Sequence, residues 1–238
     1  MKRFWKDVSV IAAEGGWQIA LDGRAIKTQG GKAQILPTRA LAEMLAGEWR
    51  AQGDEVDPAT FPLRDMADYA IDQVAADPAG AAAKLLAYAE TDTLCYRADP
   101  DEPLHARQQD VWEPIVTAFE AREGVRLARV SGIVHHLQPD ATMNALRARL
   151  ARFDPFILAP LEVMTALSAS LCVGLSALER DADHAALWTA SELEEHWQAE
   201  LWGRDEEAKA RHDTRTKAFM LAADFARAAT ATDNNGEA

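Results

Sequence analysis

Cysteine is scarce in this sequence of 238 residues, which contains only Cys95 and Cys172. Two cysteines cannot supply the disulfide framework of a small secreted domain or the ligands of a cysteine-type zinc site. Cys95 has no neighbouring feature that would activate it as a nucleophile, so we expect a small buried hydrophobic residue. The low cysteine content predicts a protein of a reducing compartment.

Positively charged residues are also few: 25 Lys and Arg stand against 38 Asp and Glu, which gives a net charge of −13. Nucleic-acid phosphates and anionic membrane surfaces both require a basic face on the protein that binds them. The charge balance therefore argues against nucleic-acid and membrane partners. It fits a protein that meets a basic or apolar surface of another protein.

No apolar run is long enough to predict a membrane span. The longest, residues 156–178, is interrupted by Pro160, Glu162 and several Ser and Thr residues, so we expect a helix of the protein core. Residues 1–7 lead directly into a strand-like run, without the apolar centre of a secretory signal or a long acid-poor amphipathic leader. We therefore expect a bacterial cytoplasmic protein, or one that has already been processed.

Motifs for cofactor or metal binding are missing as well. Residues 30–32, Gly-Gly-Lys, lack the other positions of a phosphate-binding P-loop, and no Gly-x-Ser-x-Gly sequence occurs. The adjacent His135 and His136 would point to opposite faces of an extended segment, where they could not easily share an ion. We expect no cofactor and no metal.

Residues 1–36 are the only part of the chain that is rich in strand-forming residues. Four short runs are separated by residue pairs that tolerate positive φ and favour tight hairpin turns, namely Gly15-Gly16, Asp22-Gly23 and Gly30-Gly31. The pattern predicts a small antiparallel β-meander. A helix capped by Thr38, with Leu41, Leu45 and Trp49 on one stripe, would cover its apolar face, and a second helix is expected over 63–74.

After residues 77–80, Asp-Pro-Ala-Gly, the composition changes to almost pure helix. The fold class is therefore predicted as α+β, with a mixed α/β domain over 1–78, an all-α domain over 79–229 and a disordered polar tail over 230–238. Helices are expected at 80–92, 104–123, 141–151, 154–178, 183–202 and 205–229. Residues 125–137 are expected to be extended, without an identifiable pairing partner.

The helix expected at 183–202 carries an unusual mixture of acidic and aromatic residues. At 100° per residue, one side would form a buried stripe consisting of Ala186, Ala190, Leu193, Trp197 and Leu201. Glu194 lies at the edge of this stripe and forms a polar ridge with Ser191, Gln198 and Trp202. The ridge is either the solvated flank of an ordinary amphipathic helix or a surface that contacts another protein.

Several ordered motifs along the chain carry a resemblance to a known family. They are Arg3–Val10 (RFWKDVSV), Leu21–Thr28 (LDGRAIKT), Pro37–Ala42 (PTRALA) with Glu48-Trp49, Pro62-Leu63 with Ala70–Asp72, Glu90–Arg97 (ETDTLCYR), Gln109–Pro114 (QDVWEP), and Leu193–Gln198 (LEEHWQ) with Trp202-Gly203. Over roughly residues 3–227 the chain resembles the F1-ATP synthase assembly chaperones that act on the α subunit, of the mitochondrial and alphaproteobacterial type.

The resemblance implies a small mixed α/β domain followed by a helical domain, and a chaperone that uses no cofactor, metal or small-molecule substrate. The implied client is the unassembled α subunit of F1-ATPase, whose subunit interface the chaperone shields while it promotes assembly of the F1 sector. The sequence departs from the family pattern at Glu192, where relatives tend to be basic, and at Asp68, where Asn is common.

Within this hypothesis, the predicted client-binding residues are Glu194, Glu195, Gln198 and Trp202, and one of the two carboxylates would pair with a basic residue of the client. Leu193 and Trp197 are expected in the core. Glu90, Asp92 and Arg97 are predicted to form a structural carboxylate–arginine cluster, and Trp49 to be a structural core residue.

Two alternatives come from other functional classes. One is an uncharacterised hydrolase that uses Glu90 and Asp92, or Glu194 and Glu195 with His196. Adjacent glutamates on a helix diverge by about 100°, which argues against a carboxylate pair flanking one substrate. The other alternative is a structural scaffold subunit, which would need a strong oligomer interface that the sequence does not reveal.

Overall fold

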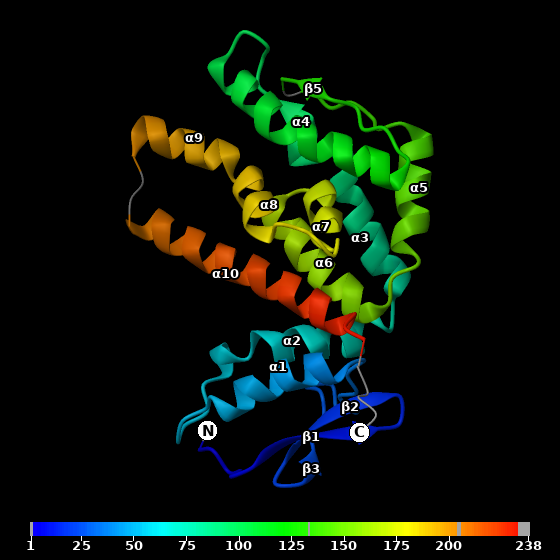
Figure 1. Ribbon diagram of the computed structural model, residues 1–238, viewed down its shortest axis with the longest axis vertical. Helices are drawn as coiled ribbons and strands as arrows, with labels where there is room; N and C mark the ends of the chain where they lie inside the picture. Colours follow the sequence, from blue (N-terminus) through cyan, green and yellow to red (C-terminus); the bar gives the residue numbers. More distant parts are fainter. Residues whose placement is uncertain (1, 133, 204–205, 233–238) are drawn as a thin grey trace. The chain divides into compact units, whose positions relative to one another are not determined.

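The computed structural model in Figure 1 describes residues 2–132, 134–203 and 206–232. The chain divides into two compact units: the first consists of Met1–Pro78, Asp154–Pro160 and Asp224–Ala238, and the second of Ala79–Phe153 and Leu161–Ala223. The units differ from the predicted domains 1–78 and 79–229 because two later segments join the first unit. Most of the predicted tail, 233–238, lies outside the described residues.

The first unit contains a three-stranded antiparallel sheet in the order β1-β2-β3, formed by Val8–Ala13, Gly16–Leu21 and Arg24–Ala25. The β1–β2 register pairs Val8 with Leu21 and Ala13 with Gly16. Asp22 and Gly23 both have positive φ, 48° and 78°, as the predicted tight turn between β2 and β3 requires. With the helices that follow, this sheet confirms the predicted α+β class.

The fourth predicted strand is wrong. Residues 33–36 make only isolated bridges, between Lys27 and Ala33 and between Trp17 and Leu36. The reason is that carboxylates bind the loop before them: Asp68 accepts hydrogen bonds from the Gln29 amide and the Gln34 side chain, and Asp72 accepts them from Thr28 and Gly30. These side-chain bonds replace the ladder that would have continued the meander.

Helix α1 (Arg39–Arg50) packs against strands β1 and β2, and further helical elements follow it in the first unit. They are the 3₁₀ turn η1 (Pro58–Thr60), α2 (Pro62–Tyr69) and the π-helical turn η2 (Ala70–Val74). Thr38 caps α1 by accepting a hydrogen bond from the Leu41 amide, and Leu41 and Leu45 are fully buried. Trp49, in the last turn of α1, is half-buried between the rings of Trp5 and Phe61.

The second unit is mainly helical, with α3 (Pro78–Glu90), α4 (Pro103–Glu123), α5 (Asp140–Leu150), α6 (Pro155–Ser168), α7 (Leu171–Ala177), α8 (His184–Ser191), α9 (Leu193–Trp202) and α10 (Glu206–Ala229). Pro78 of α3, residues 155–160 of α6 and residues 224–229 of α10 belong to the first unit. Among the described helices, none combines the length and the apolar character needed to cross a membrane.

Two of the predicted helices are broken. The helix expected over 154–178 is α6 followed by α7, because Ala169 takes the left-handed conformation (φ 49°) and Ser170 caps α7 through the Val173 amide. The helix expected over 183–202 is α8 followed by α9, and the break lies at Glu192 (φ −94°, ψ 11°).

The extended segment after α4 does have a pairing partner. Val130–Ser131 forms β5 and pairs in parallel with β4, Tyr96–Arg97, which follows the 3₁₀ turn η3 (Thr93–Cys95). Arg129 holds the segment against α4 through Glu113 and Glu120. Hydrogen bonds from Arg129 and then Arg97 lower the pKa of Glu113 to about 2, so this carboxylate stays charged.

The expected cluster of Glu90 and Asp92 with Arg97 does not form. Asp92 is buried and accepts hydrogen bonds from the Leu94 amide (3.1 Å), the Ser170 hydroxyl (2.7 Å) and the Cys172 amide (2.9 Å). Arg97 is buried elsewhere and pairs with Glu113 at 2.7 Å, while Glu90 is exposed. Asp92 and Arg97 are close together in the sequence, but Asp92 binds around the start of α7 and Arg97 binds α4.

Asp92 allows a test of this internal anchor. We expect Asp92→Asn to reduce the free energy of unfolding by about 1–3 kcal/mol, because an amide cannot accept all of these hydrogen bonds. Burial raises the pKa of Asp92 to about 6 from an ordinary value of 3.8. The folded state therefore binds a proton more readily than the unfolded state, and the contribution of Asp92 to stability decreases as pH rises from about 4 to about 6.

The measurement is urea unfolding of the natural protein and of Asp92→Asn at intervals from pH 4 to pH 7. The advantage of the natural protein should be largest at the acid end and should shrink toward pH 6. An advantage that grows with pH would show that the carboxylate is stabilised in its charged form instead.

Candidate functional site on helix α9

The break at Glu192 changes which residues of α9 are buried. Leu193 is 5% exposed, as expected for a core residue. Leu201 and Trp202, however, are 57% and 82% exposed, and Ala186 on α8 is exposed too, so the predicted continuous stripe is wrong. A stripe drawn at 100° per residue cannot continue across an interruption of the helix. The far end of α9 therefore presents two large apolar side chains to solvent.

One carboxylate oxygen of Glu194 contacts α4. Its Oε1 accepts a hydrogen bond of 2.7 Å from the buried Gln108 side chain, whose own oxygen accepts from the Ala98 amide. Partial burial raises the pKa of Glu194 above its ordinary value, although the Gln108 hydrogen bond acts in the opposite direction. The predicted ridge is thus anchored at Glu194, whereas Gln198 is exposed.

The middle of α9 is fastened to α4 by an arginine. The Arg107 guanidinium donates to both carboxylate oxygens of Glu200, at 2.6 and 2.9 Å, and lies 5.6 Å from the ring centre of Trp197. Trp197 is only half-buried, so the expectation of a core tryptophan is met in part. The Arg107 bond lowers the pKa of Glu200.

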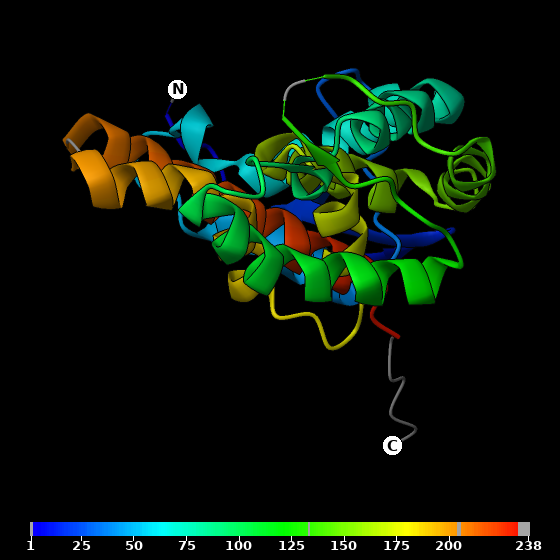
Figure 2. The ribbon, with the colours of Figure 1, turned by 90° about the horizontal axis from the view of Figure 1, so that it is seen from above.

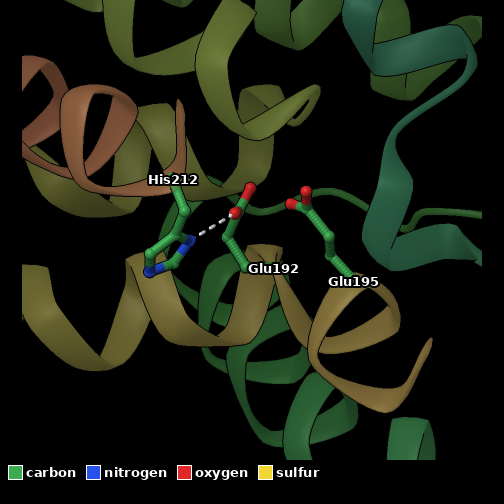
Figure 3. A group of neighbouring side chains, drawn as sticks. All are labelled: Glu192, Glu195 and His212. Atoms are coloured by element: carbon green, nitrogen blue, oxygen red, sulfur yellow. Dashed lines mark hydrogen bonds and ion pairs between the residues drawn. The ribbon is translucent and has the colours of Figure 1, made fainter. Parts of the chain in front are cut away.

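A carboxylate–histidine cluster joins the base of α9 to α10, as Figure 3 shows. Glu192 is 4% exposed and pairs with Nδ1 of His212 at 3.1 Å and with Arg215 at 2.9 Å. Arg215 also reaches Glu195 at 3.2 Å. Burial, and then a hydrogen bond shared with Glu195, raise the pKa of Glu192. The sequence analysis did not predict this cluster, because the partners of Glu192 and Glu195 lie 20 or more positions further along the chain.

The same cluster has the composition of a cation site. One ligand atom each from Glu192, Glu195 and His212 lies within 4.8 Å of the others. The Arg215 guanidinium bridges both carboxylates, so the positive charge that they require is supplied by the chain itself. A metal ion could enter only if Arg215 moved away.

The geometry separates the carboxylates that the hydrolase alternative would use. Glu194 bonds to Gln108 on α4, whereas Glu195 pairs with Arg215 on α10. Glu90 and Asp92 are also separated, because Glu90 is exposed and Asp92 is buried. Neither pair can flank one substrate, so the arrangement suits contact with another protein better than acid–base chemistry.

Figures 1 and 2 show where these residues lie in the second unit. In both views α9 lies beside the first part of α10, and α4 passes near it. The exposed surface at this end combines Leu201 and Trp202 with the exposed polar groups of Gln198 and Glu200. We call Glu194, Glu195, Gln198, Leu201 and Trp202 the α9 surface. It has an apolar end and an acidic flank.

Comparison with known proteins identifies the family of this chain. The family model of the ATP12 chaperone protein matches residues 2–120. The mitochondrial protein atp12 of Schizosaccharomyces pombe is 27% identical over 219 residues, which cover 87% of this chain and 75% of that protein.

Solved structures agree over almost the whole chain. Atp12 from Paracoccus denitrificans superimposes with a TM-score of 0.91 at 36% identity and covers 96% of this chain and 98% of its own. A protein of Agrobacterium tumefaciens gives a TM-score of 0.90, also at 36% identity, over 95% of this chain and 85% of its own. The chain therefore belongs to the ATP12 family of F1-ATPase assembly chaperones, and it is a chaperone rather than an enzyme.

Proposed function

We propose that this chaperone binds the α subunit of F1-ATPase before assembly, through the α9 surface, and shields an interface that β subunits later cover. The observation that carries the proposal is the exposure of Trp202, 82%, beside Leu201 at 57%. Tryptophan is the residue type most enriched at the energetic centre of protein interfaces. An exposed tryptophan and the exposed leucine beside it form an apolar patch that is suited to burial against a partner.

The acidic flank suits a client with basic residues beside an apolar patch. Glu194 uses one oxygen for Gln108 and keeps acceptor capacity on the other, whereas Glu195 is already paired with Arg215 and adds negative charge beside it. Charges at the rim of an interface mainly accelerate encounter and fix orientation. A complex held by a small apolar contact and a charged rim can later yield to the larger interface of the assembled F1 sector.

The compartment that we infer is the bacterial cytoplasm, or the mitochondrial matrix for eukaryotic relatives. Support comes from the bacterial proteins among the solved relatives and from the mitochondrial protein of Schizosaccharomyces pombe. Both cysteines, Cys95 and Cys172, are unpaired and buried, which fits a reducing compartment.

Trp202→Ala tests the apolar end of the α9 surface. We expect at least about a tenfold loss of affinity for purified α subunit, because a central tryptophan of an interface commonly contributes 2 kcal/mol or more. The melting temperature should remain unchanged, since the side chain is largely exposed. Affinity is measured by calorimetry, and chaperone activity by the soluble yield of co-expressed α subunit.

The matched control is Phe4→Ala, which removes another exposed aromatic side chain (69%) in the first unit. It should leave α-subunit affinity as it is in the natural protein. Equal affinity of Trp202→Ala and the natural protein would refute the role of the α9 surface, and no binding by the natural protein would refute the proposed client.

Two substitutions of Glu194 distinguish the role of its charge from the role of its hydrogen bond to Gln108. Glu194→Gln keeps an acceptor for Gln108 but removes the charge, whereas Glu194→Lys reverses it. We expect the lysine variant to associate with the α subunit more slowly than the glutamine variant, and the effect to fade at high salt. Stopped-flow association rates check this.

Glu14→Lys, in the exposed β1–β2 turn, is the charge-matched control. It should associate almost as fast as the natural protein. If Glu194→Lys unfolds while Glu194→Gln stays folded and binds normally, the carboxylate is a structural anchor rather than a client contact.

A further inference from the structure

A groove in the second unit, away from the α9 surface, lies between α3 and α5. Its volume is about 540 Å³, and its walls include the small side chains of Ala83 and Ala87 together with the apolar Leu86 and Met143. Leu137, which belongs to the lining, is 79% exposed, and Val134, three residues earlier in the chain, is 68% exposed. Together they supply two of the six large hydrophobic residues that the described surface leaves most open. We call this feature the α3–α5 groove.

The residues outside the described ranges do not include an apolar segment that could fill the groove. The residues outside the described ranges are Met1, Ile133, Arg204-Asp205 and the polar run 233–238 (DNNGEA), and none of these is an apolar segment. A second copy of the chain is disfavoured because each copy carries a net charge of −13, so like charges oppose self-association. The occupant should therefore be a different protein.

The two ends of the groove carry opposite charges. Glu90, the last residue of α3, and Asp140, the first residue of α5, both belong to the lining. Arg147 lies seven residues further along α5, about 10 Å away at 1.5 Å per residue. One end of the groove is thus acidic and the other basic, with an apolar stretch of alanines, Leu86 and Met143 between them.

This pattern matches a short amphipathic helix. Two turns of helix present anchors at i, i+3 or i+4, and i+7 over about the same 10 Å, and the alanine walls allow close backbone approach. The positive N-terminal end of such a helix, with any lysine or arginine there, would face Glu90 and Asp140, and its negative C-terminal end would face Arg147.

We propose that the α3–α5 groove binds an amphipathic helix of the protein client as a second contact, separate from the α9 surface. This inference rests on the proposed function, because the client it names is the F1 α subunit. Two contacts on one client increase the overall affinity without requiring either to be strong, and each can be released in turn.

The first test places a charge inside the groove. Ala83→Glu changes an exposed position in the middle of α3, so the fold should be kept. The affinity for purified α subunit should fall about tenfold or more, because an unpaired carboxylate would be buried under an apolar helix. Ala121→Glu makes the same change at an exposed position of α4 outside the lining, and should bind as the natural protein does.

The second test identifies what lies in the groove. Both natural cysteines are buried, so Ala83→Cys offers one reactive thiol for a photocrosslinker such as maleimido-benzophenone. Crosslinking to an α-subunit segment with apolar residues at i, i+3 or i+4, and i+7 is the expected result. Crosslinks to a second copy of the chaperone, or none to the α subunit, would overturn the inference.

The two experiments also separate this inference from the proposed function. If the natural protein binds no α subunit, the proposed client is wrong, and the inference falls with it. If the natural protein and Ala83→Glu bind the α subunit equally well, the groove is not a contact, but the proposed function stands.

Discussion

The architecture of the candidate site depends on one buried carboxylate, that of Glu192. This side chain is 4% exposed, and two residues of α10 contact it: the Arg215 guanidinium pairs with it at 2.9 Å, and Nδ1 of His212 lies 3.1 Å from its other oxygen. These contacts accompany the break between α8 and α9 and fix the direction in which α9 leaves. Because of that direction, Leu193 points into the core and Trp202 into water. The break at this ion-paired residue therefore separates the buried Leu193 from the exposed Leu201 and Trp202.

Local patterns made much of the fold predictable. The Asp22-Gly23 turn, the Thr38 cap and the stripe of α1 are all determined by neighbours in sequence, and each occurs as expected. The helix breaks were not predictable in the same way. Neither Ala169 nor Glu192 is a helix-breaking residue by intrinsic propensity, so the interruptions reflect tertiary contacts rather than local preference.

Long-range partners account for the other differences between sequence and structure. Asp92 and Arg97 are five residues apart, which suggested an ion pair, but one is bound by α7 and the other by Glu113 of α4. The loop at 28–34 is held by Asp68 and Asp72, about 40 positions later in the chain, and for that reason does not continue the sheet. Residue types revealed the candidate surface, but only the structure showed which of its carboxylates were already engaged.

The ion pairs that hold α9 to α4 and α10 differ in how strongly salt weakens them. At its base, the Glu192 side chain is almost completely shielded from water, so mobile ions screen its pairing weakly. Further along, Arg107 and Glu200 are both substantially exposed, and electrolyte weakens their attraction much more. As ionic strength rises, we expect the ion pair between Arg107 and Glu200 to weaken while the pairing of Glu192 with Arg215 persists. The salt-sensitive contact of α9 is therefore the one nearer to the exposed Trp202.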